Sequence, residues 1–198
     1  MHCAEQIVKS GHLGDFLKAM VTHKESSAIL IRIAYILGNL TTNFEEARSF
    51  LCDEPETFKI IFELASFYLE KDRVNHEEPH KAGSAAGGKV NKYEEFNTGN
   101  LEDALTKVIK LLANLSTEET VALVEFHKAD TKQLLITFLK QLFSAVDRRT
   151  VENNEEFILN AISCTTNILY YDTAQKPILE SDLRAIIFHS SKQFLLAT

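Results

Sequence analysis

Three stretches of the chain, residues 30–41, 105–116 and 158–169, share one pattern of polar and apolar positions. Plotted at about 100° per residue, each stretch places three polar side chains on one narrow stripe. The rest of each circumference is apolar or small, apart from Thr165 and Thr166 in the third stretch. A helix with so wide an apolar surface must be covered by other helices on nearly all sides. The pattern therefore predicts three repeated helices in which only the polar stripe meets solvent or a partner.

The polar stripe is formed by the same three positions in each repeated helix. Its members are Arg32, Tyr35 and Asn39, then Lys107, Lys110 and Asn114, then Asn160, Ser163 and Asn167. The stripe contains three cations and no carboxylate, whereas the whole chain has a formal net charge of -7. This contrast predicts that an acidic extended segment of a partner binds across the stripe. The alternative is a solvated surface that only keeps the protein soluble.

Further helices are predicted around the repeated ones. Amphipathic spacing and the helix-starting signals Pro55, Thr22 with Glu25, and Ser116 with Glu119 mark their positions. One helix precedes the first repeated helix, and the others cover residues 44–51, 57–71, 120–127, 131–145 and about 182–196. Alternating β-branched runs are absent, so the predicted class is all-α. The order of short, medium and repeated helix recurs along the chain.

Two insertions separate the repeated helices by more than the usual period of a helical repeat. Residues 72–100 contain four glycines, scattered charges and few apolar side chains. Such a segment cannot offset its ordering entropy by burial, so we expect a flexible insertion loop there. A smaller insertion is expected at residues 146–153. The chain as a whole, residues 1–198, is predicted to be a single array.

The repeated helices resemble the third helices of armadillo repeats, which end in a signature of Asn, Leu and Ser or Thr. The matching residues here are Asn39-Leu40-Thr41 and Asn114-Leu115-Ser116, and more weakly Asn167-Ile168-Leu169. The resemblance covers nearly the whole chain outside residues 72–100. It implies an armadillo-type right-handed α-solenoid of about three to four repeats, some of them incomplete.

A narrower resemblance comes from the strings RIAYILGNLT, KLLANLS and NAISCTTNILYY, which begin at Arg32, Lys110 and Asn160. Together with the long loop before the second repeated helix, they look like the armadillo repeat-containing protein 2 family. That family is associated with cilia and flagella. The resemblance implies a non-enzymatic protein–protein interaction scaffold in the axoneme, its radial spokes or their assembly. The alternative is a soluble cytoplasmic or nuclear armadillo adaptor in transport or signalling.

The resemblance also implies a role for the asparagines of the polar stripe. In armadillo proteins the asparagine at this position commonly hydrogen-bonds the backbone of a bound partner, and Asn39, Asn114 and Asn167 match it. The alternative is that they bond neighbouring loops or water. Nuclear-import armadillo proteins carry Trp four residues before this asparagine, where this chain has Tyr35, Lys110 and Ser163. A basic import signal would be repelled by the lysines, so that class of partner is disfavoured.

Composition limits which partners and which cellular location we expect for this protein. The net charge of -7 argues against general nucleic-acid binding, which needs clustered Lys and Arg. Three cysteines, Cys3, Cys52 and Cys164, are odd in number and lack metal-ligand spacing, which indicates free thiols in a reducing compartment. No signal peptide or membrane span is predicted. We therefore expect a location in the cytoplasm and cytoskeleton, and by resemblance in the ciliary axoneme.

Two motifs mimic enzyme sites. His76-Glu77-Glu78-Pro79-His80 matches the H-E-x-x-H pattern of zinc proteases, but Pro79 would break the helix that this chemistry needs. Residues 83–89 match the core of a phosphate-binding loop, but Val90 replaces the magnesium-binding hydroxyl and no strand precedes it. No catalytic residue, metal site or cofactor is predicted, and the chain is not expected to be an enzyme.

The C-terminal segment is rich in hydrophobic residues that a further repeated helix would normally cover. We expect an interface at this end, formed by Ile187, Phe188, Phe194 and Leu195. Either the chain is a piece of a longer array, or another protein covers this end.

Overall fold

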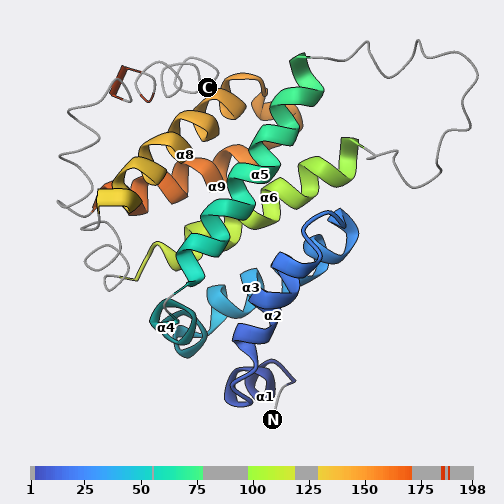
Figure 1. The fold of residues 1–198 in the computed structure, drawn as a ribbon, viewed down its shortest axis with the longest axis vertical. Helices are drawn as coiled ribbons and strands as arrows, with labels where there is room; N and C mark the ends of the chain where they lie inside the picture. Colours follow the sequence, from blue (N-terminus) through green and yellow to red (C-terminus); the bar gives the residue numbers. More distant parts are fainter. Residues whose placement is uncertain are drawn as a thin grey trace, which may run out of the picture.

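Helices supply all the regular secondary structure of the described residues in the computed structural model, and no strand occurs among them (Figure 1). The structure describes residues 3–54, 56–77, 98–118, 129–170, 184, 185 and 187. The helices are α1 (Cys3–Lys9), α2 (Leu13–Thr22), α3 (Ser27–Asn43), α4 (Glu45–Asp53), α5 (Thr57–Glu77), α6 (Thr98–Leu115), α8 (Ala129–Asp147) and α9 (Val151–Tyr170). The all-α prediction is confirmed.

The three repeated helices are α3, α6 and α9, and they form the middle of the molecule. Helix α6 packs against α3 on one side and against α9 on the other (Figure 1). Helix α5 lies across α6 and also packs against α8. Helices α2 and α4 pack against α3. The sequence places α3, α6 and α9 at the ends of successive helix groups, and the fold brings them side by side.

Helix α6 is buried on nearly all sides, as its pattern predicted. Leu105, Ile109 and Leu112 are fully buried, and so are Val108 and Leu111, which lie further around the helix. Its polar stripe residues are only partly buried. A run of apolar side chains around a whole helix is favourable only when neighbouring helices remove it from water. The contacts with α3, α5 and α9 provide this cover.

The same prediction is wrong for parts of α3 and α9. Ile29 and Ile36 of α3 are 40% and 36% exposed, and Leu159 and Ile162 of α9 are 56% and 38% exposed. The reason lies in the order of the helices. Among the described residues, α6 has a repeated helix on each side, whereas α3 and α9 each have one on a single side. The sequence pattern alone does not distinguish a middle helix from an end helix.

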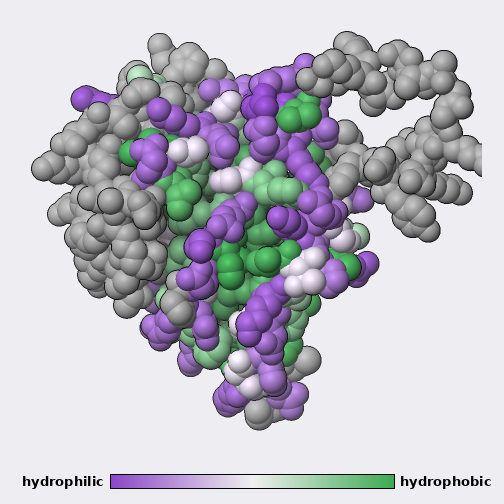
Figure 2. Space-filling view, viewed as in Figure 1, coloured by the Kyte–Doolittle hydropathy of each residue, from purple (hydrophilic) through white to green (hydrophobic). Residues whose placement is uncertain are grey.

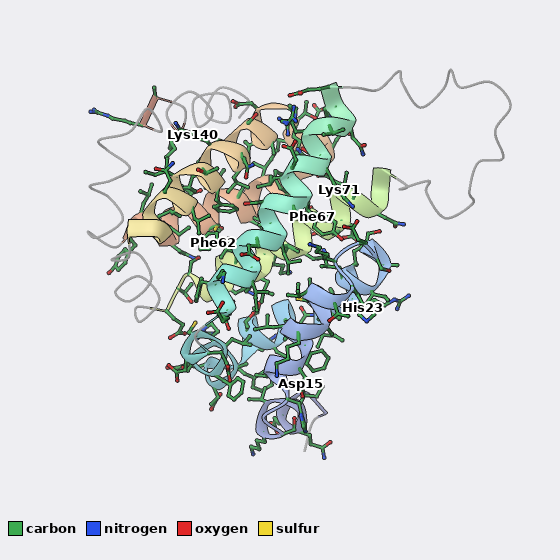
Figure 3. The ribbon with its side chains drawn as sticks, viewed as in Figure 1. Asp15, His23, Phe62, Phe67, Lys71 and Lys140 are labelled. Carbon is green, nitrogen blue, oxygen red and sulfur yellow. The ribbon has the colours of Figure 1, made fainter. Side chains whose placement is uncertain are left out.

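Aromatic side chains join α5 to its neighbours. Phe62 of α5 meets Phe138 of α8 edge to face, with ring centroids 5.1 Å apart. Tyr68 donates a 2.8 Å hydrogen bond to the backbone carbonyl of Lys24, after α2. The Lys71 ammonium lies 4.3 Å from the centroid of the Phe67 ring on the same helix (Figure 3). Figure 2 shows hydrophobic residues gathered near the middle of the face that carries α2 and α5, with hydrophilic residues along its borders.

Several predicted boundaries need correction. Residues 72–77 and 98–100 were expected in the insertion loop, but α5 continues to Glu77 and α6 begins at Thr98. The polar end of α5 is stabilised because Arg73 pairs with Glu70 and Glu77 one turn away, while Asp72 is bound by arginines from outside the helix. Residues 78–97, which hold most of the expected loop and of both enzyme-like motifs, lie outside the described residues.

The N-terminal region and the turn before α9 also differ from expectation. Two helices, α1 and α2, precede α3 instead of one, and Thr22 is the last residue of α2, where its hydroxyl donates to the Lys18 carbonyl. It therefore does not cap α3. The insertion expected at 146–153 is a short turn at 148–150 followed by a kink at Asn154 in α9. The predicted helix at 120–127 falls outside the described part of the chain, as does most of the predicted helix near 182–196.

Candidate functional site

The polar stripe lies on three adjacent helices, as the sequence predicted, but its members differ in exposure. On α3, Arg32 is exposed, Tyr35 is 55% exposed and Asn39 is half-buried. On α6, Lys107, Lys110 and Asn114 are all partly buried. On α9, Ser163 is exposed while Asn160 and Asn167 are partly buried. The α3 end of the stripe is therefore the part most open to a partner.

The asparagines link neighbouring repeated helices. The Asn114 amide donates to the Gly38 carbonyl of α3 at 2.9 Å, and it also lies 3.1 and 2.9 Å from the hydroxyls of Thr41 and Thr42. The Asn167 amide donates to the Ala113 carbonyl of α6 at 2.9 Å. In both cases the acceptor is the residue just before the asparagine of the preceding helix. We call these two contacts the asparagine ladder.

Small residues stand before the first two asparagines. Gly38 and Ala113 are both buried, and each offers its backbone carbonyl to the asparagine of the next repeated helix. A helix carbonyl has a second lone pair beyond its intrahelical bond, so it can accept this extra hydrogen bond. The sequence indicated the asparagines but not their acceptors, because hydrogen-bond partners 54 and 76 residues away are set by helix packing.

We expect the substitution Gly38→Ala to stabilise the protein. Gly38 lies inside α3, and a Cβ added there would meet no heavy atom within 4 Å. Alanine raises helix stability over glycine by about 1 kcal/mol because it lowers the backbone entropy of the unfolded chain. Ala113, at the equivalent position of α6, already accepts from Asn167. Urea unfolding should show a higher midpoint at an unchanged m-value; a lower midpoint would mean that the methyl group displaces Asn114.

The lysines of the stripe already have partners. Lys107 bonds both carboxylate oxygens of Glu156 on α9, at 2.8 and 2.9 Å, and lies 3.7 Å from Asp103. Lys110 lies 3.8 Å from Glu156. Glu156 is one helical turn before Asn160, so sequence reasoning that considered only the nine stripe positions missed it. Arg32, by contrast, forms no ion pair with any described residue.

A groove lies beside the first asparagine of the stripe. It has a volume of about 540 Å³ and runs between α1 and α3. Its lining residues are Ala4, Glu5, Ile7, Tyr35, Ile36, Asn39, Leu40, Asn43 and Phe44. The lining is mainly apolar with amide groups at one side, a composition typical of surfaces that bind protein segments. Tyr35 and Asn39 are therefore stripe residues that also line a groove.

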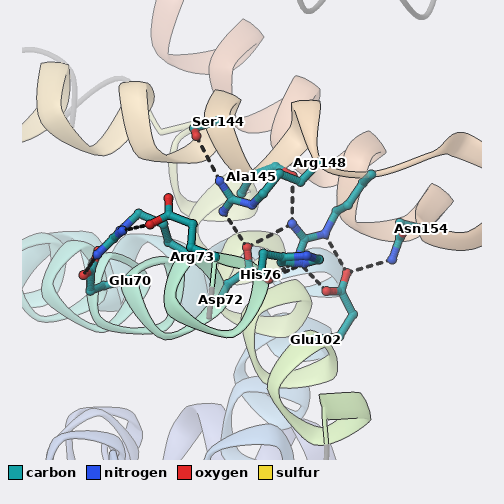
Figure 4. A network of polar contacts seen from close by, with 11 residues as sticks. Glu70, Asp72, Arg73, His76, Glu102, Ser144, Ala145, Arg148 and Asn154 are labelled. Atoms are coloured by element: carbon teal, nitrogen blue, oxygen red, sulfur yellow. Dashed lines mark hydrogen bonds and ion pairs between the residues drawn. The ribbon is translucent and has the colours of Figure 1, made fainter. Parts of the chain in front are cut away.

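An ion network that the sequence did not indicate joins α5, α6 and the turn before α9 (Figure 4). The Arg149 side chain is 2% exposed and donates to Asp72 at 2.6 and 3.1 Å and to Glu102 at 2.5 and 3.0 Å. Arg148 donates to Asp72 at 2.7 Å, and Asn154 donates to Glu102 at 3.1 Å. The Arg149 guanidinium also lies 4.4 Å from the centroid of the Phe157 ring. The network borders a polar cavity of about 360 Å³.

The network sets the protonation of its members. Burial by itself would raise the pKa of Asp72, but hydrogen bonds from Arg149 and Arg148 hold the pKa below its usual 3.8. Burial would lower the pKa of Arg149, but its bonds to Glu102 and Asp72 outweigh this and raise the pKa. Asp72 and Arg149 are therefore both ionised at neutral pH. The arrangement holds α5, α6 and the start of α9 together.

We expect acid to weaken the fold through Asp72. Because its pKa is lower in the folded state, the unfolded chain binds the proton first as the pH falls. The stabilisation is complete above the usual 3.8 and is lost as the pH drops toward the folded-state pKa. Unfolding midpoints in urea, measured from about pH 6 to about pH 3, should fall less steeply for Asp72→Asn than for the unmodified protein. Parallel curves would contradict this assignment.

Cys52 and Cys164 are free thiols. Cys164 is fully buried and Cys52 partly buried, and burial raises the pKa of each thiol to about 12. Within the described ranges, no group of His, Cys, Asp and Glu side chains could hold a metal ion. No described helix has the length and apolar composition to cross a membrane. Of the expected end interface, Ile187 is partly buried against the core, and Phe188, Phe194 and Leu195 lie outside the described residues.

Comparison with known proteins supports the predicted relationship to armadillo-repeat proteins. The chain is similar to armadillo repeat-containing protein 2 of three mammals. It is 26% identical to the Mus musculus protein over 157 residues, 23% to the Homo sapiens protein over 168, and 22% to the Bos taurus protein over 169. No family model matches the chain, and no solved structure matches it.

The similarity spans most of this chain but a small part of each relative. It covers 79%, 85% and 85% of the chain, and 16%, 18% and 18% of the Mus musculus, Homo sapiens and Bos taurus proteins. The chain thus spans less than a fifth of the length of the curated relatives it matches. The predicted resemblance to armadillo proteins, based on short sequence strings, is confirmed by these similarities of 22–26% identity.

Proposed function

We propose that this protein is a non-enzymatic protein–protein interaction scaffold of the armadillo type. In this proposal the chain forms a right-handed α-solenoid of about three to four repeats, with the polar stripe as the partner-binding surface. The observation that carries it is the asparagine ladder, which aligns three repeated helices so that their stripes form one surface. The similarity to armadillo repeat-containing protein 2, whose name describes a repeat associated with protein binding, supports it.

We propose further that the protein works in the ciliary or flagellar axoneme, in the radial spokes or their assembly. The support is the similarity to armadillo repeat-containing protein 2, together with the ciliary association that the sequence resemblance implied. Its location would then be the cytoplasm and cytoskeleton, with the axoneme as the site of action. Its partners would be other proteins of a large axonemal complex, without nucleic acid or membrane.

Purification of the tagged protein from flagellated cells tests this location. Soluble, detergent-extracted and axonemal fractions are compared by mass spectrometry, with an untagged strain as the control. We expect retention in the axonemal fraction together with spoke or doublet proteins. Recovery only in the soluble fraction with cargo adaptors or nuclear proteins would contradict the axonemal proposal and support an adaptor in transport or signalling.

The partner segment that fits the stripe best is acidic and extended. Glu156 of α9 already pairs with Lys107 and Lys110, so a partner carboxylate would bind these lysines by replacing Glu156. Substitutions with opposite effects on the charge of the stripe distinguish binding of an acidic partner from a stripe that is only a solvated surface. Glu156→Gln removes the carboxylate that both lysines share, leaving Lys107 only Asp103 as an acidic neighbour among the described residues, and should strengthen capture of axonemal partners. The double substitution Lys107→Glu with Lys110→Glu should abolish capture.

Circular dichroism of each variant controls for folding, since these side chains are at least partly exposed. The effects should shrink as salt is raised, because exposed charges are screened. Partner binding that survives the double lysine substitution unchanged would show that the stripe is only a solvated surface.

A further inference from the structure

The repeated helices leave two unmatched faces, one on α3 and one on α9. In the shared register, residues 29, 32, 36 and 39 of α3 correspond to 104, 107, 111 and 114 of α6 and to 157, 160, 164 and 167 of α9. We call this set of positions the upstream face, because in α6 and α9 it carries the asparagine that bonds the preceding helix. On α3 the upstream face consists of Ile29, Arg32, Ile36 and Asn39.

The apolar residues of the upstream face are buried on both helices that have a repeated helix before them, α6 and α9. Ala104 and Leu111 of α6 are fully buried, and Phe157 and Cys164 of α9 are 1% and 0% exposed. The equivalent residues of α3, Ile29 and Ile36, are 40% and 36% exposed. Apolar side chains at this spacing remain in contact with water only because no repeated helix precedes α3 among the described residues. The Asn39 amide likewise has no hydrogen-bond acceptor in the described part of the chain.

A complementary face lies on α9. On α6, Ala113 accepts the hydrogen bond from α9, and Thr106 and Ile109 share its side of the helix at a spacing of seven and four residues; all three are at most 6% exposed. Their equivalents on α9 are Leu159, Ile162 and Thr166, of which Leu159 is 56% and Ile162 38% exposed. We call these three residues, with Glu155 one turn earlier, the downstream face. Helices α3 and α9 lie on opposite sides of α6, so the two faces point to opposite ends of the row (Figure 1).

We propose that the downstream face of one copy of this protein binds the upstream face of a second copy, head to tail. The new contact would continue the α3–α6 and α6–α9 interfaces, with α9 of one copy lying on α3 of the next. In the register of the asparagine ladder, Asn39 donates to the Thr166 carbonyl of the neighbouring copy, as Asn114 does to Gly38 and Asn167 to Ala113. Arg32 and Glu155 give the two faces opposite charges.

This choice of occupant follows from the chain itself, which carries both halves of one repeating interface. A face-to-face dimer would bring two upstream faces together, so that both sides carry the Arg32 cation and neither offers the backbone carbonyl that the asparagine ladder uses as acceptor. Head-to-tail contact is heterologous, so it generates rings or longer assemblies instead of stopping at a dimer. The groove between α1 and α3 borders the contact at the Asn39 end, where α1 would flank the incoming helix.

Two variants that each lose one face test the proposal. Ile36→Lys disables the upstream face, and Ile162→Lys disables the downstream face; both residues are more than one-third exposed, so each variant should fold. Sedimentation velocity of the full chain should show mass rising with concentration beyond a dimer. Each variant alone should be a monomer, and a mixture of the two should form a one-to-one dimer through the intact faces.

Matched controls and further variants keep the test decisive. Val74→Lys places the same charge on an equally exposed site of α5 and should leave assembly unchanged. Asn39→Ala should weaken assembly about fivefold, the effect of one lost hydrogen bond. If either lysine variant fails to fold, Ile29→Lys and Leu159→Lys replace them. A monomer at every concentration overturns the proposal, and so do single-face variants that still assemble or a mixture that does not.

Discussion

Replacing Arg149 with methionine is expected to lower the free energy of unfolding by about 3–5 kcal/mol, the usual effect of removing one partner from a buried ion network. The Arg149 side chain is 2% exposed and forms four hydrogen bonds to Asp72 and Glu102, plus one to the Ala145 carbonyl. Without it, the Asp72 side chain, itself 5% exposed, keeps Arg148 and His76 as its ion-pair partners among the described residues. Chemical denaturation followed by circular dichroism measures the loss.

The matched control for this prediction is Arg73→Met. Arg73 also pairs with two carboxylates, Glu70 and Glu77, but on the exposed surface of α5, where water replaces the lost contacts (Figure 4). Its unfolding midpoint should change little. The double variant Asp72→Leu with Arg149→Met should recover much of the stability, because it removes the buried charges together. Equal losses for Arg149→Met and Arg73→Met would show that the network contributes no more than a surface ion pair.

Replacing Phe138 with alanine should lower the free energy of unfolding by about 3–5 kcal/mol. Phe138 is 1% exposed and packs edge to face against Phe62, so it joins α8 to α5. Its removal leaves a cavity that the surrounding helices cannot fill without moving, and it also removes the aromatic pair. Urea unfolding monitored by circular dichroism is the appropriate measurement.

Leu134→Ala on the same helix provides the comparison for Phe138→Ala. Leu134 is 48% exposed, so its loss should change stability by no more than about 0.5 kcal/mol. Both substitutions place alanine in α8, so differences in helix propensity remain small. A similar loss in the two variants would contradict the packing of α8 on α5 through Phe138.

Much of the architecture could be predicted from periodicity alone. The three repeated helices, the all-α class and the placement of α4, α5 and α8 follow from spacing of apolar residues, which local chain geometry converts into helix faces. The boundaries were less predictable. Asp72 and His76 are in a polar segment that looked like loop, but α5 continues through them because Arg148 and Arg149 compensate the Asp72 charge from another part of the chain.

The sequence predicted which residues form the polar stripe, but it did not predict the contacts that these residues make with other parts of the chain. Asn114 and Asn167 could be singled out from their recurrence, while their acceptors, Gly38 and Ala113, and the competing carboxylate Glu156 could not. No local pattern connects residues 49 to 76 positions apart. Whether the stripe binds a partner stays a prediction, and its α3 end is the part that the fold leaves most exposed.

The sequence by itself determined which helices form and which side of each is apolar, because these properties depend on residues three or four positions apart. Only the tertiary structure decided which apolar sides are covered. Leu111 and Ile36 occupy equivalent positions on similar helices, yet one is fully buried and the other is 36% exposed. The difference arises because burial depends on what packs against a helix, and α6 lies between two repeated helices while α3 stands at one end of the row.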